Sequence, residues 1–402
     1  MSATKALRVL YVVYWGALEP LGQSLVVPSV RRLARSGVEV TLLSMEKPAD
    51  LADLAAVRRL EADLSADGIR WRALRYHKRP KWPATAYDSL TLLFSALRLR
   101  FARGRFDVVH ARTFVAGPVG WFIARVLGAR FIYHNEGFYP DEQVDGGVWR
   151  RDSSVHRLAK GVETFLYDHA DGLIVLSQRA RSALENRRTV SERGTPIVVV
   201  PSAVDLEAFR PPSSTPSRDP LRLVYLGSVG LRYRLDAAGR FVAALRTLAP
   251  QATLTVISRS DPALVTSMLA ASGLEREAWT LKELAHEEVP RELARHHAGL
   301  FFLTEGLSEH GCSPTKIGEY WAVGLPVVTT PNVSDTDLAV RELGVGVVVS
   351  SSASATIEAA RSLIALLADP SLKERCRQAA ERFYSLERAC IDQVRLYREV
   401  TA

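Results

Sequence analysis

The sequence is poor in cysteine, methionine and lysine. It holds three cysteines and three methionines among 402 residues, and only eight of its 52 lysine and arginine residues are lysines. Cys312, Cys376 and Cys390 are odd in number and are not spaced as metal ligands, which excludes a disulfide framework and gives no sign of a zinc site. No uncharged apolar stretch reaches about 18 residues, so we expect no membrane-spanning segment.

The remaining composition is that of a globular protein. Hydrophobic residues make up 47% of the chain and charged residues 24%, which excludes a disordered tail, a collagen-like fibre and a disulfide-stapled miniprotein. The net charge of +8 favours an anionic partner such as a nucleotide, a nucleic acid or an anionic membrane. The apolar run near the N-terminus contains Arg8 and lacks a small-residue cleavage site, so we expect a first β-strand and a cytoplasmic protein rather than a signal peptide.

Short apolar runs alternate with helical stretches along the whole chain, a rhythm that predicts doubly wound parallel sheets. The first half has strands at Leu7–Trp15, Val38–Ser44, Ile69–Leu74, Val108–His110, Phe131–His134, Gly172–Leu176 and Ile197–Val200. After the proline-rich stretch Phe209–Pro220, the rhythm restarts with strands at Leu221–Leu226, Thr253–Ile257, Gly299–Leu303, Pro326–Thr329 and Gly346–Val349.

The predicted architecture is therefore α/β, with two Rossmann-like domains that face a cleft. We expect an N-terminal domain over residues 1–210, a linker over 211–220, a second domain over 221–380 and a C-terminal helix over 381–402 that packs back toward the first domain. Since ligands of open parallel sheets lie beyond the C-terminal strand ends, functional residues should follow the strands.

The most informative segment runs from Cys312 to Thr330. A loop of Ser313, Pro314 and Thr315 leads into a helix whose free N–H groups and dipole suit an anion, with Ser313 or Thr315 as the N-cap. Lys316 adds a cation, and Glu319 lies one turn further along, where it could accept hydrogen bonds from sugar or ribose hydroxyls. The alternative is an ordinary surface helix with a Lys–Glu pair.

This segment resembles the donor-binding motif of GT-B glycosyltransferases, especially the retaining family 4. The family's Glu and its Gly-x-Pro-Val-Val are matched by Glu319 and Gly324–Val328. Further matches are Pro201–Pro211, Ala170–Ser177 and Phe106–Arg112, so the resemblance covers the whole chain. It implies a nucleotide-sugar donor that binds on the second domain, and a metal-independent reaction without a side-chain nucleophile.

The sequence departs from the family pattern at two places in the second domain. Where the family has the first of two glutamates seven residues apart, this chain has Gly311, and Glu305 or Glu309 could replace it or be solvated loop residues. The family's Arg and Lys after the first strand of this domain are not in register here. The loop offers Gly227, Ser228, Arg232 and Arg234, and Arg259 follows the next strand; we expect these residues to contact the donor.

In the first domain, Gly22 and Gln23 follow the first strand, and the resemblance implies that this Gly-rich loop faces the donor, with Ser24 as an N-cap. His134 ends a strand and resembles the family's histidine beside the reacting carbon; the alternative is a histidine bonded to backbone. We expect catalytic roles for His134, Lys316 and Glu319. Acceptor-side candidates from the neighbouring strand ends and the loop that follows are His110, Arg112, Glu136, Asp141 and Glu142.

The predicted function is glycosyl transfer from a nucleotide-diphosphate sugar, with UDP or GDP as carrier, to a glycan, lipid-linked or small-molecule acceptor. We expect no metal and no other cofactor. The alternatives are a nucleotide-sugar epimerase or hydrolase of the same fold, and a degenerate binding protein without turnover. Nucleic-acid binding is disfavoured because no recognition motif occurs.

A basic and aromatic segment, His77–Pro83, precedes the apolar helix predicted over Tyr87–Arg103. Such a combination suits the anionic inner face of the cytoplasmic membrane. A core-facing helix with a solvated arginine edge is the alternative.

Overall fold

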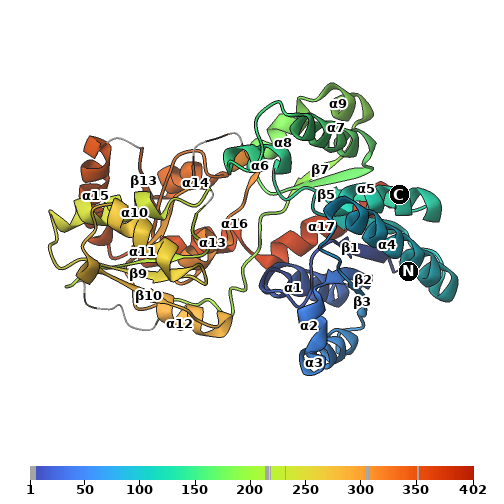
Figure 1. Cartoon of the computed structure of the whole chain (residues 1–402), viewed down its shortest axis with the longest axis horizontal. Helices are drawn as coiled ribbons and strands as arrows, with labels where there is room; N and C mark the ends of the chain where they lie inside the picture. The colour runs from blue at the N-terminus through green and yellow to red at the C-terminus, as the bar shows by residue number, and fades with distance from the viewer. Residues whose placement is uncertain are drawn as a thin grey trace. The chain divides into compact units, whose positions relative to one another are not determined.

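The structure is a computed structural model that describes residues 6–212, 217, 219–230, 232–304, 306, 308–350 and 353–402, with the backbone alone at 81, 82, 103 and 353. The chain divides into two compact units (Figure 1). Unit 1 comprises Met1–Pro140, Asp152–Pro201 and Leu386–Ala402, and unit 2 comprises Asp141–Arg151 and Ser202–Ser385.

Unit 1 contains a parallel sheet of seven strands in the order β3-β2-β1-β4-β5-β6-β7. The central strands are almost wholly buried, as expected where helices cover both faces of a parallel sheet. The strands are β1 (Arg8–Val13), β2 (Glu39–Glu46), β3 (Arg70–Arg75), β4 (Val108–Arg112), β5 (Arg130–His134), β6 (Gly172–Val175) and β7 (Ile197–Val199).

The helices of unit 1 connect these strands, and the last helix of the chain joins them. That helix, α17 (Leu386–Thr401), contacts α1 and the strands β5, β6 and β7. The others are η1 (Gly22–Val26), α1 (Val27–Arg35), α2 (Pro48–Ala52), α3 (Leu54–Ala66), α4 (Lys81–Arg103), α5 (Ala116–Leu127), α7 (Ser154–His169), α8 (Gln178–Glu185) and α9 (Arg188–Arg193), with α6 (Tyr139–Asp145) at the division between the units.

Unit 2 contains a parallel sheet of six strands in the order β10-β9-β8-β11-β12-β13. Its strands are β8 (Arg222–Leu226), β9 (Thr253–Ile257), β10 (Trp279–Lys282), β11 (Ala298–Phe301), β12 (Val327–Thr329) and β13 (Gly346–Val348). Its helices are α10 (Leu235–Arg246), α11 (Pro262–Ala271), η2 (Arg276–Ala278), η3 (His286–Glu288), α12 (Val289–Leu293), η4 (Ser308–Gly311), α13 (Thr315–Ala322), α14 (Thr336–Leu343), α15 (Ala353–Leu367) and α16 (Leu372–Phe383).

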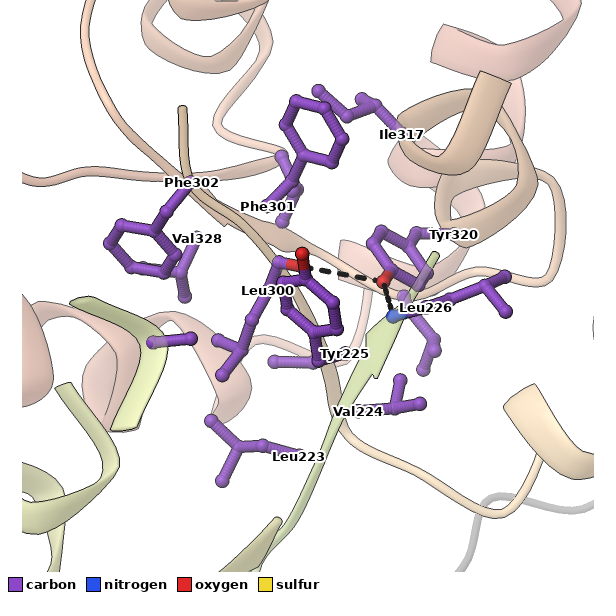
Figure 2. Packing of buried hydrophobic residues seen from close by; sticks show 14 of the residues in the cluster. Leu223, Val224, Tyr225, Leu226, Leu300, Phe301, Phe302, Ile317, Tyr320 and Val328 are labelled. Atoms are coloured by element: carbon purple, nitrogen blue, oxygen red, sulfur yellow. Dashed lines mark hydrogen bonds between the residues drawn. The ribbon is translucent and has the colours of Figure 1, made fainter. Parts of the chain in front are cut away.

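The strand order reverses at β8 and β11 in unit 2, and this is where Tyr320 of α13 joins the sheet (Figure 2). Its buried hydroxyl accepts a hydrogen bond from the Leu226 N–H at 2.9 Å and donates one to the Leu300 carbonyl at 3.3 Å. The Tyr320 ring also lies over Gly299, where an added Cβ would approach it to 2.3 Å. These contacts fix α13 against the ends of the two strands at the switch point, the region where open parallel sheets bind ligands.

The predicted doubly wound architecture is confirmed, with three differences in its elements. The edge strand β10 was not predicted, because charged residues surround it and leave no apolar run. The C-terminal helix expected from residue 381 begins only at Leu386, since α16 extends to Phe383 and the backbone of Tyr384 and Ser385 pairs with Val204. The expected loop after Gly137 contains the helix α6.

The units divide at Pro201, nine residues before the expected boundary at 210, and Leu386–Ala402 belong to unit 1. Of the expected linker 211–220, residues 213–216 and 218 lie outside the described residues. All three cysteines are buried and free. Within the described part of the chain, no helix combines the length and apolar character needed to cross a membrane.

Candidate active site

The segment identified from the sequence forms an ion pair at the start of α13. Lys316 Nζ lies 2.9 Å from Oε1 and 3.1 Å from Oε2 of Glu319, so both carboxylate oxygens are engaged. The Glu319 side chain is 4% exposed, whereas that of Lys316 is 29% exposed. The buried Glu319 carboxylate therefore holds the Lys316 ammonium group at the N-terminus of α13.

The turn after β8 comes close to this lysine. Gly227 has φ +135°, a conformation that side-chain-bearing residues rarely adopt, and its ideal Cβ position lies 4.0 Å from Lys316 Cγ. The turn is fixed by hydrogen bonds from the Gly227 N–H to the Ile257 carbonyl and from the Tyr225 hydroxyl to the Ser228 carbonyl. The structure therefore brings together Gly227 and Lys316, which are 89 positions apart in the sequence.

The start of α13 differs from the expected cap. Pro314 holds the N-cap position, and no side chain caps the helix. Ser313 Oγ instead accepts a hydrogen bond from the backbone N–H of Ser202 at 3.0 Å, and Thr315 is the first helical residue. The prediction of Ser313 or Thr315 as N-cap is wrong, because proline occupies the cap and Ser313 is engaged with Ser202. The first-turn N–H groups consequently have no side-chain acceptor within the described residues.

Arg232 is buried in a polar cluster. Its guanidinium lies 3.3 Å from the Glu142 carboxylate and donates to Ser308 Oγ at 3.3 Å. Burial by itself would lower the pKa of this guanidinium, but the charge of Glu142, with smaller contributions from Cys312, Tyr233 and Glu309, outweighs burial and leaves the pKa raised. Arg232 is therefore a permanently charged group held by Glu142 and Ser308.

Glu142 belongs to the segment Asp141–Arg151, which is part of unit 2 although it lies in the first half of the sequence. Asp145 of the same segment accepts a hydrogen bond from the Ser308 N–H at 3.1 Å and closely approaches Gly306. Asp141 is buried. Glu142, expected as an acceptor-side candidate of the first domain, thus contacts the loop that follows β8, and Asp145 contacts the loop that follows β11.

The loop around the missing family glutamate is well packed. Gly311 and Glu309 are both buried, and the Glu309 carbonyl accepts hydrogen bonds from Ser334 and Cys312. The alternative of Glu309 as a solvated loop residue is wrong, since it is 1% exposed. Glu305, the other candidate, lies outside the described residues.

Arg234 and Arg259 are each paired with a nearby acid, Asp236 and Glu283 respectively. Arg234 pairs with Asp236 at 2.6 and 2.8 Å, and these bonds, with a contribution from Arg240, lower the Asp236 pKa to about 2. Arg259 is largely exposed and lies 3.6 Å from Glu283.

Unit 2 also contains a cavity of about 310 Å³. Its lining residues are Arg234, Ala237, Arg240, Phe241, Phe302, Leu303, Thr304, Thr330, Val349, Ser350 and Thr356.

In unit 1, His134 lies at the end of a buried hydrogen-bonded chain. Its Nδ1 is 3.1 Å from His110 Nε2, and His110 Nδ1 is 2.5 Å from the hydroxyl of Tyr397 in α17. His110 has no exposed surface and stacks on Tyr11 with ring centroids 4.1 Å apart. Both nitrogens of His110, a residue expected on the acceptor side, are thus engaged by side chains of unit 1.

Arg112 and Glu136 form a buried ion pair beside these histidines, with Nε 2.5 Å from Oε1. Arg112 also donates to the Tyr11 hydroxyl and to the Leu25 carbonyl. Burial, together with the charge of Arg112, lowers the pKa values of His110 and His134 well below the ordinary range. Both imidazoles are consequently neutral at pH 7.

The loop between β1 and α1 is organised by a buried carboxylate. Glu46 accepts hydrogen bonds from the Ala17 and Leu18 N–H groups at 2.7 and 3.1 Å, and its pKa is raised by burial. Gln23 donates its amide to the Ala17 carbonyl, and an added Cβ at Gly22 would lie 2.0 Å from the Gly16 carbonyl. The expected Ser24 cap is wrong, because Ser24 lies inside η1.

Four contributors had no signal in the sequence. Glu46, Asp145 and Ser308 occur in segments without a motif, and Tyr397 lies 287 residues from its histidine partner. Only the folded topology brings them to the strand ends.

The comparisons with known proteins bear on the fold and on the family. The sequence model of Glycosyltransferase Family 4 matches residues 26–208, while comparison with curated protein sequences gives no match. Among solved structures, the chain is similar to sucrose-phosphate synthase from Thermosynechococcus elongatus, with a TM-score of 0.70 and 16% identity over 98% of this chain and 99% of that chain.

Two further structures are similar. HepE from Anabaena in complex with UDP-glucose gives a TM-score of 0.62 and 15% identity, covering 98% of both chains. The lipopolysaccharide outer core galactosyltransferase WaaB gives 0.64 and 12%, covering 98% of this chain and 99% of that chain. At these identities the likeness establishes the fold. With its two doubly wound sheets the chain has the GT-B fold, and its residues 26–208 match the sequence model of Glycosyltransferase Family 4.

Proposed function

We propose that the protein transfers a hexose from a nucleotide-diphosphate sugar to a glycan, lipid-linked or small-molecule acceptor, with retention and without a metal. The observation that carries this proposal is the meeting of the Gly227 turn with Lys316 at the N-terminus of α13. The similar HepE structure is a complex with UDP-glucose, which supports a UDP-sugar as the donor.

In the proposed complex, Lys316 and the first N–H groups of α13 hold the diphosphate. Negative charge builds on the leaving phosphate oxygen during transfer, and a preorganised cation with backbone donors stabilises that charge. In the free protein both oxygens of Glu319 are occupied by Lys316. When Lys316 turns toward the phosphates, Glu319 becomes available to accept hydrogen bonds from sugar or ribose hydroxyls. The pair thereby couples recognition of the two parts of the donor.

The proposed roles of the other cations differ with their surroundings. Arg232, held by Glu142 and Ser308, shapes the loops around the donor, whereas Arg234 and Arg259 lie toward solvent and assist binding less. Gly22 and Gln23 shape the loop after β1, and His134 contacts the donor sugar. We assign Arg112 and Glu136 to support of the strand ends, since they are paired with each other.

A turnover assay tests the proposal. The protein is incubated with UDP-, GDP-, ADP- and dTDP-sugars, with and without glycan and lipid-linked acceptors, and both diphosphate release and sugar transfer are measured. Acceptor-dependent transfer is expected. Release or isomerisation without an acceptor would indicate the epimerase or hydrolase alternative, and tight donor binding without any turnover would indicate a degenerate binding protein.

We further propose that the acceptor is reached at an anionic membrane surface through α4. Its outward side chains include Tyr87, Leu90, Phe94 and Phe101, which are 52–87% exposed. Its one acid, Asp88, is fully buried and bonded to His77 and Tyr14, so the exposed charges of α4 are basic. An apolar stripe with a basic border fits the headgroup region of an anionic leaflet.

Vesicle co-sedimentation tests this attachment. Phosphatidylglycerol-containing vesicles should retain the wild type, and phosphatidylcholine vesicles should retain much less. The double variant Phe94→Ser/Phe101→Ser should lose binding, while Leu338→Ser, which removes an exposed leucine of α14, should keep it. Equal binding of all three proteins would refute the role of α4.

A further inference from the structure

Unit 1 contains a buried polar chain with one open end. Tyr397 and His110 have no exposed surface and His134 is 2% exposed, and the three groups are linked in sequence by the 2.5 Å and 3.1 Å contacts. At the far end, His134 Nε2 is buried and has no hydrogen-bond partner among the described residues. Buried polar atoms are almost always satisfied, so an open nitrogen at a strand end indicates a place for a ligand atom.

The chain permits two proton arrangements. In the first, the Tyr397 hydroxyl donates to His110 Nδ1, His110 donates from Nε2 to His134 Nδ1, and His134 carries its hydrogen on Nε2. In the second, every bond is reversed, and the Tyr397 hydrogen needs another acceptor. The described residues provide no second partner for this hydroxyl, and a buried hydroxyl without an acceptor costs about 1–3 kcal/mol. The first arrangement satisfies every group except His134 Nε2.

The backbone around His134 supports a fixed orientation. Its carbonyl accepts a hydrogen bond from the Thr113 N–H at 3.1 Å, and Thr113 has φ +86°. A β-branched residue in that region is strained, and such strain persists where the surroundings hold it in place. His134 is therefore held both through its ring and through its main chain.

We propose that Tyr397 and His110 are positioning residues that fix His134 as the Nε2–H tautomer, which then donates a hydrogen bond to an oxygen of the bound sugar or its phosphate. The inference rests on the proposed function for the identity of that ligand, but the tautomer is a property of the free protein. It makes α17, which the sequence presents as a closing helix, part of the functional centre of unit 1.

The tautomer is measured by NMR on the full chain with ¹⁵N-labelled histidine, because protonated and unprotonated ring nitrogens have distinct shifts. The His134 signals are assigned with His134→Gln. We expect hydrogen on Nε2 in the wild type, and a mixture of tautomers in Tyr397→Phe. The control Tyr167→Phe removes another buried hydroxyl of unit 1, one that contacts Asn135, and should leave the signals unchanged. Hydrogen on Nδ1 of His134, or an unchanged tautomer in Tyr397→Phe, would overturn the proposal.

Kinetics supplies an independent test. Tyr397→Phe should lower kcat about tenfold or more, while the KM for the nucleotide sugar stays within about twofold. The reason is that the hydrogen bond from His134 Nε2–H to the transition state is weakened. His134→Gln keeps an N–H near the Nε2 position without needing the relay, so adding Tyr397→Phe to it should cost nothing further. An additive loss in the double variant would assign Tyr397 to packing alone. Absence of turnover with every nucleotide sugar would instead count against the proposed function, and the NMR result would stand.

Discussion

The two parallel sheets have the same topology at their centres, and each has a buried ion pair at its strand ends, Arg112 with Glu136 in unit 1 and Arg232 with Glu142 in unit 2. They differ in the groups that stand beside those pairs. In unit 1 the open atom is the neutral imidazole nitrogen of His134, reached through uncharged partners. In unit 2 the corresponding group is the ammonium ion of Lys316, which is held on Glu319. Neutral hydrogen-bond donors can bind hydroxyl groups and produce only a weak electrostatic field. The cation of an ion pair can instead bind an anion such as a phosphate. The shared fold therefore does not determine the chemistry of the strand ends, which depends on a few side chains.

The largest effect should come from breaking the ion pair of unit 2. Lys316→Ala leaves the buried Glu319 carboxylate without its partner, which should destabilise the protein by about 2–4 kcal/mol. The double variant Lys316→Ala/Glu319→Gln removes the orphaned charge and should recover most of that loss. Urea unfolding of the three proteins measures it. Equal stability of the single variant and the wild type would mean that the pair contributes nothing to the fold.

The neutral imidazoles of unit 1 should make the stability of the protein depend on pH. Since the pKa values of His110 and His134 are lowered in the folded state, the unfolded chain binds more protons below about pH 6.5. Stability should therefore be full above that pH and fall as the pH drops below it, by about 1.4 kcal/mol per pH unit for each histidine. His296 in unit 2, with a pKa near 4, adds in the same direction.

Unfolding midpoints between pH 8 and 5.5 measure this slope. The double variant His110→Gln/His134→Gln should retain only the part due to His296 and other groups. If the slope is the same as in the wild type, the two imidazoles are not the proton-linked groups, and the contrast between the units loses its basis.

A smaller effect is expected at the turn beside Lys316. Gly227→Ala forces a side chain into φ +135° and should cost about 1–2 kcal/mol of stability. Donor affinity should also fall, because the turn that faces Lys316 shifts. Gly273→Ala is the matched control, with φ +76° and no atom within 4 Å of its added Cβ. An equal loss of donor affinity in both variants would show that the Gly227 turn has no specific role in donor binding.

The smallest effect should follow Arg234→Gln. Its side chain is 39% exposed, and Asp236 keeps Arg240 as a partner at 2.9 Å. Exposed pairs contribute about 0–1 kcal/mol, so thermal stability should hardly change and donor affinity should fall less than in Lys316→Ala. A larger loss of donor affinity in Arg234→Gln than in Lys316→Ala would indicate that the diphosphate binds in the cavity that Arg234 lines and not beside Lys316.

Local patterns predicted most of the fold. The run Thr253–Ile257 has the same bounds in the structure as in the prediction, since its apolar character is strong. The edge strand β10 was missed because charged residues surround it and leave no apolar run. The break between α16 and α17 was missed because it depends on Val204, which pairs with Ser385 from a distant part of the chain.

The site was predictable where its residues are close in sequence. Lys316 and Glu319 are three residues apart on one helix, so their pairing follows from helical geometry. The partners of Arg232 and His134 come from segments far away, namely Glu142 and Tyr397. Spacing carries no information about such contacts, and the burial that engages both His110 nitrogens is visible only after folding.

The central claim, that the strand ends of unit 2 bind a nucleotide-sugar through Lys316, is tested most directly by calorimetric titration of UDP-glucose and GDP-mannose into three proteins. The wild type should bind one of the two donors with 1:1 stoichiometry. Lys316→Ala should bind it at least about a hundredfold more weakly, and Lys316→Ala/Glu319→Gln should remain weak although its fold is restored. Affinity in the two variants equal to that of the wild type would contradict the account.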